Sequence, residues 1–595
     1  MLYPQIKALC VLALCLLDNG VVGKPFDAEP ALQTTKYIDT RATGDWRKVS
    51  AISMKRRQEA LDKFFPIRAP DESKLPNDLR SYMKTSRLLS RDELRIINME
   101  AEELLSKIQR RQLTAVKVAT AFSKAAVIAQ NLTNCLTEVI IEEGLKRAQF
   151  LDNYQRRTGK VIGPLHGLPI SLKDSYITPP FPSSIGMAYH ANVPTDIPAV
   201  MVTMLEDMGA VFYVKTNVPT AMMMMETINN VYGETRNPIH KKLTPGGSSG
   251  GEGALIAMRA SPLGIGTDIG GSVRIPSGFC HLYGLKPSFG RFPTWGNRAG
   301  IPGQDLIYSV SGPMSTSLRT VELFSEAMVS AGPWNSDPKL HPIPWKKNVI
   351  SRHQKLRFAI FPCRDGVATC YPPVERALQQ VKAALQRAGH EVVDWVPTNQ
   401  AAIEGLAGEI IAETGSDALL PMLKAFNEPL LGTMKFLFPN GKPGGTGLGP
   451  EKLRQLIIRR NQIQKDHLDQ WMGTASKNRG PIDGLISPIH VAPAPRLSST
   501  PELVYAGFTG YGNMLDLPAC TFPVTYSSKK LDPKRPKTWV PISQRDEMIQ
   551  ADYDPAFWDE APVSLQLLGK RLEEEKVLEM TKIVADILKF EHREH

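Results

Sequence analysis

Serine and glycine are concentrated in one segment, residues 246 to 288, which reads GGSSGGEGALIAMRASPLGIGTDIGGSVRIPSGFCHLYGLKPS. Apolar stretches interrupt the segment, so it is not a low-complexity linker. Glycine permits positive φ and lets several backbone N–H groups point at one anion or oxyanion. A serine hydroxyl beside such groups is a candidate nucleophile. The residue types therefore point either to anion binding or to acyl-transfer chemistry.

Three interpretations of this segment compete. A phosphate-binding loop needs GK[ST], or GxGxxG directly after a strand, and neither pattern is present here. A nucleophile elbow is favoured by the GxSxG match around Ser249, with His490 as a downstream base, but residues 241 to 246 do not read as the buried strand that an elbow requires. The third interpretation is structural, with glycine turns joining a sheet to its helices. These residues alone leave the choice open.

The segment resembles the signature of the amidase signature family of serine hydrolases. The resemblance covers about residue 88 to the C-terminus and continues through GPLHGLPISLKD at 163–174, VKTNVP at 214–219, GLKP at 284–287 and APVSLQLLG at 561–569. Within the family, the chain is most similar to fungal acetamidase-type amidases, on LTNC at 132–135, METINN at 225–230 and ADYDP at 551–555. The resemblance implies an α/β fold with a single large domain. Its central sheet is mixed, mostly parallel and twisted, and helices cover both faces.

The family uses a Ser–cis-Ser–Lys triad. Matched position by position, the resemblance implies Ser272 as the nucleophile, Ser248 as the bridging serine after a cis peptide bond, and Lys173 as the base. The resemblance also implies which residues contact the substrate. These are Ser248, an oxyanion hole and one further backbone segment. The oxyanion hole is expected from the backbone N–H groups of Ile269, Gly270, Gly271 and Ser272, and the backbone segment is the one around Met222.

The chemistry of a lysine base can be argued without the resemblance. A serine hydroxyl attacks an amide only when a neighbour removes its proton, and a lysine can do this only while it is neutral. Lys173 must then be buried and kept away from carboxylates that would hold its proton. It follows the apolar run 168–172, and in a continued strand the side chain of Asp174 points to the opposite face.

Other residues near these motifs have open roles. Asp268 and Arg274 flank the glycine loop and are expected to pair and hold it, unless both are unrelated surface charges. The run Met222 to Met225 is either an adaptable apolar wall of the substrate pocket or the start of a core helix. Cys280 is a poor candidate nucleophile, because nothing nearby in the sequence would lower its pKa.

The elements that must position these residues alternate between strand and helix. A capping box at Ser90–Glu93 starts amphipathic helices that continue to about residue 130. Strands are expected at 167–172, 210–215, 356–361, 391–395, 483–486 and 563–568, and helices at 199–208, 373–388 and 573–590. Strand–helix–strand units of this kind predict a mostly parallel sheet with helices on both faces.

The N-terminal region lies outside this pattern. Residues 1–23 are expected to be either a secretory signal peptide or an irregular extension, which leaves a secreted and a cytoplasmic location open. Residues 24–87 are expected to form an extension with one short helix from about Ser53 to Phe64. Residues 88–595 form the predicted catalytic domain.

Composition excludes several classes of protein. The chain of 595 residues is 42% apolar and 22% charged, as in globular proteins, and it has no apolar run long enough for a polytopic membrane protein. The net charge of +11 is spread along the chain without nucleic-acid recognition motifs. The seven cysteines lack CxxC spacing, which predicts free thiols. The sequence shows no cluster of His or Cys residues with metal-ligand spacing, so no metal site is predicted. We therefore expect no cofactor, no nucleic acid and no stable membrane insertion, while a homodimer stays open.

The resemblance and the residues together leave three functions. The first is an amidohydrolase that cleaves a linear carboxamide to a carboxylate and ammonia or an amine through an acyl-enzyme. The second is a glutamine-dependent amidotransferase subunit, which would need a partner enzyme and an arginine for the glutamine carboxylate. The third is a lipid (fatty acid) amide hydrolase, which would need an exposed amphipathic helix. The acyl group stays open, from nutrient amides to an intermediate of secondary metabolism.

Overall fold

The structure is a computed structural model that describes residues 43–351, 354–432, 434–438, 449–477, 479–497 and 505–594. Residues from Thr43 onward belong to one compact unit. The expected signal-peptide segment 1–23, with its two cysteines, and residues 24–42 of the extension lie outside the described residues.

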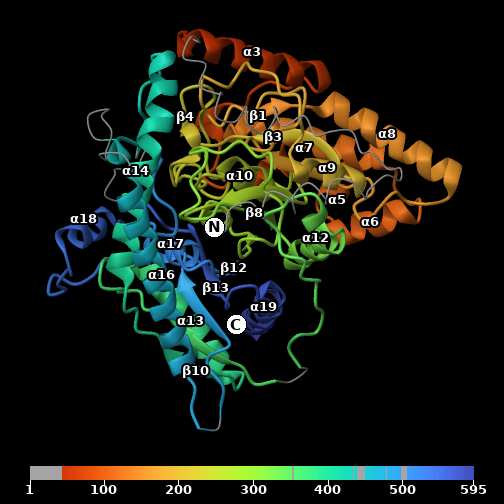
Figure 1. Cartoon of the computed structure of the whole chain (residues 1–595). Coiled ribbons are helices and arrows are strands. Elements are labelled where there is room, and N and C mark those ends of the chain that lie inside the picture. The colour runs from red at the N-terminus through yellow and green to blue at the C-terminus, as the bar shows by residue number, and fades with distance from the viewer. Residues whose placement is uncertain are drawn as a thin grey trace, which may run out of the picture. The chain divides into compact units, whose positions relative to one another are not determined.

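An eleven-stranded mixed sheet forms the centre of this unit (Figure 1). In spatial order its strands are β1 (Leu136–Val139), β3 (Val211–Thr216), β2 (Pro169–Lys173), β6 (Gly264–Asp268), β8 (Val310–Ser315), β7 (Tyr283–Lys286), β12 (Ala519–Tyr526), β13 (Pro562–Leu568), β11 (Gly484–Pro488), β9 (Arg357–Ile360) and β10 (Glu391–Asp394). Strands β3, β2 and β6 are mutually parallel neighbours, as are β11, β9 and β10, and antiparallel pairs join these two groups. The expected mixed sheet is therefore confirmed. A separate hairpin pairs β4 (Ile228–Asn229) with β5 (Gly233–Glu234).

Helices flank the sheet in two groups whose members contact one another. The first group includes α7 and α11, both packed on α10, and the second includes α12 and α13, both packed on α19. The helices are α3 (Trp46–Phe64), α4 (Tyr82–Thr85), α5 (Arg91–Ile97), α6 (Ala101–Gln109), α7 (Ala115–Thr133), α8 (Ile141–Thr158), α9 (Val200–Asp207), α10 (Gly250–Ala257), α11 (Arg274–Phe279), α12 (Leu318–Ser330), α13 (Pro372–Arg387), α14 (Gln400–Ala425), α15 (Met434–Leu437), α16 (Pro450–Gly473), α17 (Gly507–Met514), α18 (Gln544–Asp552) and α19 (Glu574–Glu594). None of them, within the described residues, has the length and apolar character that a membrane span requires.

Local signals in the sequence explain where several helices begin. The predicted capping box is present: Ser90 Oγ accepts the N–H of Glu93 at 3.2 Å, and the Glu93 carboxylate accepts the N–H of Ser90 at 2.8 Å. These bonds satisfy N–H groups that have no partner inside a helix. Helices α5, α6 and α7 follow this cap and confirm the amphipathic helices expected up to about residue 130.

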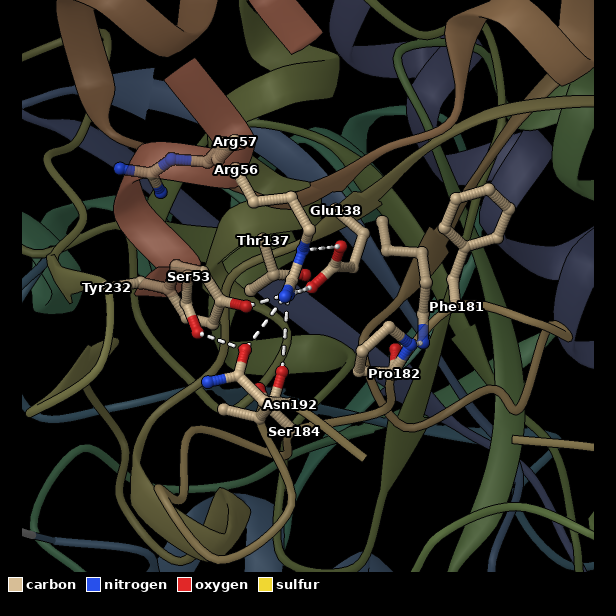
Figure 2. Close-up of polar contacts among 12 residues, drawn as sticks. Ser53, Arg56, Arg57, Thr137, Glu138, Phe181, Pro182, Ser184, Asn192 and Tyr232 are labelled. Atoms are coloured by element: carbon tan, nitrogen blue, oxygen red, sulfur yellow. Dashed lines mark hydrogen bonds and ion pairs between the residues drawn. The ribbon is translucent and has the colours of Figure 1, made fainter. Parts of the chain in front are cut away.

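Helix α3 is longer than expected and is tied to the edge strand β1. It begins at Trp46, ahead of the expected start near Ser53. The Arg56 guanidinium donates to the Glu138 carboxylate at 2.6 and 3.3 Å and to Asn192 Oδ1 at 2.7 Å (Figure 2). The Tyr232 hydroxyl also donates to Glu138, at 3.0 Å. The helix is therefore held to the sheet by a charge-assisted contact whose carboxylate is almost fully buried.

We predict that Arg56→Ala lowers the free energy of unfolding by about 2 kcal/mol. The change leaves the buried Glu138 carboxylate without its guanidinium, and the expected cost is below that of a fully buried pair because Arg56 is partly exposed. Urea unfolding of the two proteins measures the difference. The matched control is Arg47→Ala, whose exposed pair with Asp45 should contribute less than about 1 kcal/mol. Equal losses in both variants would contradict the anchoring role.

Candidate functional site

The predicted site residues meet where two parallel strands end. Strand β2 ends at Lys173 and its parallel neighbour β6 ends at Asp268, so both chain ends lie at the same edge of the sheet. Crevices outside the carboxyl ends of parallel strands are the usual ligand sites of α/β sheets. Ser248 lies just before α10, and Ser272 lies between β6 and α11.

Lys173 is fully buried, and polar oxygens surround its amine. Its Nζ lies 2.8 Å from Ser248 Oγ, 2.7 Å from Thr267 Oγ1 and 3.4 Å from the Thr267 carbonyl oxygen. Burial lowers the pKa of Lys173 from 10.5 to about 7, because desolvation of the ammonium outweighs attraction by Asp268 and Glu252. A substantial fraction of the amine is therefore neutral near pH 7.

Asp174, the residue that follows Lys173, turns away from the lysine as expected. Its carboxylate accepts the Ser184 hydroxyl at 2.6 Å and the Ile185 N–H at 2.7 Å, and it lies 3.5 Å from Lys215 Nζ. Lys215 in turn donates to the Pro182 carbonyl at 2.7 Å. Figure 2 shows Pro182 and Ser184 in this neighbourhood. The carboxylate adjacent in sequence is therefore paired with Lys215 and does not hold the proton of Lys173.

The two serines of the proposed triad lie on adjacent backbone segments. The peptide bond between Gly247 and Ser248 is cis, which is the geometry that the resemblance implies at this position. The Ser249 N–H donates to the Ser272 carbonyl at 3.2 Å and joins the two segments. Gly247 has no room for a side chain, because a Cβ there would lie 2.4 Å from the Glu226 carbonyl oxygen.

Asp268 and Arg274 form a buried ion pair that shapes the glycine loop. Two guanidinium nitrogens of Arg274 each lie 3.1 Å from an Asp268 oxygen, and both side chains are fully buried. Although burial alone would raise it, the charge of Arg274 holds the pKa of Asp268 well below its usual range. The same carboxylate accepts the N–H groups of Gly271 at 2.8 Å and Val273 at 3.1 Å. The expected pairing is present, and the alternative of two surface charges is wrong.

The loop between β6 and α11 offers free backbone donors. Within the part of the chain that the structure describes, the N–H groups of Ile269, Gly270 and Ser272 have no hydrogen-bond acceptor. The Gly271 N–H, the fourth of the expected set, is already donated to Asp268. Thr509 Oγ1 donates to the Gly270 carbonyl at 2.7 Å and fixes the loop from helix α17. Three N–H groups of this loop are therefore available as donors among the described residues, and Asp268 and Thr509 hold the loop in place.

The methionine run does not begin a core helix. Met222 ends a short 3-10 turn, Thr220–Met222, and both Ala221 and Met222 have positive φ. The Ala221 N–H donates to the Ile185 carbonyl at 2.8 Å, so this segment is tied to the loop that Asp174 holds. Met222 is partly exposed, as an apolar wall would require.

The alternative sites considered from the sequence find no support. No strand lies within residues 241–246, all of which are described, so the backbone of a nucleophile elbow is absent there. His490 packs edge-on against the Phe279 ring and accepts the Ala492 N–H at 3.0 Å. Burial raises the pKa of the Cys280 thiol well above its usual range, which disfavours the thiolate. Among the described residues, no group of three or more His, Cys, Asp or Glu side chains is arranged to hold a metal ion.

Sequence reasoning missed two polar residues that complete the surroundings of Lys173. Thr267 lies beside the lysine amine, and Glu252 is buried between strands β2 and β3. Neither stands out by type or spacing. The only available signal is the general rule that a buried lysine must have polar partners.

The chain is similar to known proteins in sequence and in fold. The family model "Amidase" matches residues 117–578. An acetamidase of Emericella nidulans is 36% identical over 87% of this chain and 95% of its own length, and "Amidase 1" of Gibberella moniliformis is 37% identical over 83% and 94%. The solved structure of a fatty acid amide hydrolase matches with a TM-score of 0.85 and 30% identity, over 93% of this chain and 99% of the other. The chain therefore belongs to the amidase family, the amidase signature hydrolases, and is an amide-hydrolysing enzyme.

Proposed function

We propose that this amidase cleaves a linear carboxamide through an acyl-enzyme on Ser272, with Ser248 as the proton relay and Lys173 as the base. The observation that carries the proposal is the buried Lys173 amine, whose pKa is lowered to about 7 and whose Nζ lies 2.8 Å from Ser248 Oγ. A neutral amine in contact with a serine hydroxyl is the arrangement that general-base activation of serine requires.

Acylation follows from these positions. Ser272 Oγ attacks the amide carbon while Ser248 takes its proton and passes its own proton to the neutral Lys173. The tetrahedral intermediate then collapses, the C–N bond breaks, and the proton returns from Lys173 through Ser248 to the leaving nitrogen. Ammonia or a small amine departs and the acyl group remains as an ester of Ser272. Water attacks the ester by the same proton path and releases the carboxylate.

The negative charge of the intermediate would be met by the loop after β6. The free N–H groups of Ile269, Gly270 and Ser272 are the available donors, and the Gly271 N–H contributes only if it is shared with Asp268. Such preorganised donors each stabilise a tetrahedral oxyanion by about 3–4 kcal/mol. Gly270 suits this position because the space around it is open for an incoming carbonyl.

The substrate class is proposed from the relatives. The fungal proteins named acetamidase support a small linear amide that is cleaved to a carboxylate and ammonia. A long-chain amide is a second candidate, favoured by the likeness to a fatty acid amide hydrolase over nearly all of that chain. A glutamine-dependent subunit remains the third, and it requires a partner protein.

The first prediction from this mechanism concerns the triad and the substrate. Purified chain should release ammonia from acetamide-like amides without a partner, and a panel of short, aryl, indole and long-chain amides together with glutamine ranks the acyl groups. Ser272→Ala and Ser248→Ala should lower kcat at least about 10²-fold, because each interrupts the proton path.

Ser249→Ala provides the matched control. Ser249 is the neighbour of Ser248, but its Oγ lies 3.4 Å from the Thr267 carbonyl and has no place in the proton path. This variant should keep most of the activity. Full activity of Ser272→Ala would contradict the proposed nucleophile, and activity only with glutamine and a partner would favour the amidotransferase.

The second prediction is a pH dependence. Lys173 works only as the neutral amine, so kcat/KM should fall as the pH drops through about 7 and level off above it. Lys173→Arg should be inactive at every pH, because a guanidinium stays charged. Steady-state rates between pH 5 and pH 9 measure the profile. A flat profile through pH 7 would exclude Lys173 as the titrating base.

The third prediction concerns the buried pair behind the loop. Asp268→Asn leaves the Arg274 guanidinium buried without a counter-charge and should cost about 3 kcal/mol of stability. It also removes the negative charge that attracts the proton of Lys173, so the acid limb of kcat/KM should move to lower pH.

The control for that variant is a second Asp–Arg pair outside the site. Asp532 is buried and pairs with Arg376 of α13 at 2.7 Å. Asp532→Asn should also destabilise the protein but should leave the acid limb in place. If both variants move the limb equally, or neither does, Asp268 does not act on Lys173.

A further inference from the structure

A buried glutamate joins the two elements that carry the proposed base and relay. Glu252 lies in the first turn of α10, the helix that begins just after Ser248, and its side chain is fully buried. One carboxyl oxygen, Oε2, lies 2.5 Å from Ser171 Oγ of β2, and the other, Oε1, accepts the Thr216 hydroxyl of β3 at 2.9 Å. The carboxyl group therefore bridges α10 to both strands.

The hydroxyl protons around this carboxyl group can be counted. Ser261 donates its only proton to the Leu263 carbonyl at 2.8 Å, so Ser261 Oγ acts as an acceptor toward Ser171, 2.9 Å away. Ser171 then donates its only proton to Ser261. In this arrangement the remaining contact, between Ser171 Oγ and Glu252 Oε2, takes its proton from Glu252. The Leu263 carbonyl also accepts the Ser171 N–H at 3.2 Å, so in the reverse arrangement Ser261 donates to Ser171 and Ser171 donates to Glu252, which would leave a buried carboxylate without a cation in contact among the described residues.

The surroundings agree with an uncharged carboxyl group. No cation within the described part of the chain forms an ion pair or hydrogen bond with Glu252, although a buried carboxylate normally requires one. Gly264 leaves the space that the group fills, because a Cβ at 264 would lie 2.0 Å from Glu252 Oε2. Burial raises the pKa of Glu252 to about 8, against the opposing effects of Ser171, Thr216 and Lys173.

The two strand contacts of Glu252 lie next to Lys173. Ser171 precedes Lys173 by two residues on β2, so the two side chains share a face of the strand. Thr216 is the β3 partner of Lys173 in the ladder. From helix α10, which follows Ser248, the Glu252 carboxyl group thus contacts the strand that carries Lys173. It also contacts Thr216, the residue paired with Lys173 in the sheet.

We propose that Glu252 is a neutral carboxylic acid that positions Lys173 against Ser248, donating from Oε2 to Ser171 and accepting from Thr216. This inference rests on the proposed function of Lys173 and Ser248. The neutral state has a second consequence: an ionised Glu252 would attract the proton of Lys173 and reduce the fraction of free base.

The other titratable groups around Glu252 are uncharged near neutral pH. Burial raises the pKa of Cys135 to about 12 and raises the pKa values of Tyr176 and Tyr213 above their usual range. Among the described residues, Lys173 is the only cation that acts on Glu252, and Asp268 acts on Lys173 from β6. Thus the charge state of Lys173 depends on Glu252 and Asp268.

Two substitutions of Glu252 in the full-length enzyme separate its possible roles. Glu252→Gln keeps an acceptor for Thr216 and a donor for Ser171, as a protonated acid does. Glu252→Met removes both bonds at similar size. We expect Glu252→Met to lower kcat about tenfold or more with little change in KM, and Glu252→Gln to restore most of that loss without moving the acid limb of kcat/KM.

Infrared difference spectra at pH 7 test the proton directly. Wild type minus Glu252→Gln should contain the C=O stretch of one protonated carboxylic acid, a readout independent of activity. Absence of that band, or an acid limb that moves to lower pH in Glu252→Gln, would show that Glu252 is ionised and would overturn the inference. Unchanged kcat in a folded Glu252→Met would remove its positioning role. Failure of the triad itself would appear separately, as activity retained by Lys173→Ala.

Discussion

The proposed mechanism depends on keeping one buried lysine amine uncharged. An ammonium ion inside a protein is stable only if a carboxylate or several oxygens replace its water shell, so a buried lysine either pairs or loses its proton. Lys173 has hydroxyl and carbonyl oxygens in contact, from Ser248 and Thr267, and no carboxylate of the described residues touches it. Its amine can therefore accept hydrogen bonds and protons at neutral pH. Desolvation of the ammonium outweighs the attraction that Asp268 and Glu252 exert on its proton.

Three acidic residues near the lysine are each controlled in a different way. Asp174 is paired with the buried Lys215. Asp268 is ionised, but Arg274 balances its charge and its oxygens accept hydrogen bonds from backbone N–H groups of the glycine loop. Glu252 has no cation in contact within the described part of the chain, and we propose that it is uncharged. The same arrangement explains why the site contains so many buried polar groups, since each one needs a partner once water is excluded.

The sequence predicted the elements of this site better than its contacts. The capping box at Ser90 and the apolar strand before Lys173 were visible because their signals are local. Strands β6 (GIGTD) and β8 (VSGPMS) were not predicted, since glycine, serine and proline give no strand signal and only the neighbouring ladders stabilise them. The positions of Lys173, Ser248 and Ser272 came from the resemblance, and the residues alone left an elbow with His490 open. The contact of Ser171 with Glu252 joins residues 81 positions apart, which no periodicity can reveal.

In the proposed mechanism, the glycine loop lets a charge support catalysis without touching the substrate. If all four N–H groups of the loop faced an incoming carbonyl, nothing in the loop itself would hold its shape. Asp268 engages the Gly271 and Val273 N–H groups and Arg274 neutralises the carboxylate, so two donors fix the backbone while three others have no acceptor among the described residues. A rigid loop loses no free energy to reorganisation when charge develops on the oxyanion. The buried pair is costly to desolvate and adds little net stability, so its retention is explained by the geometry it imposes on the open donors.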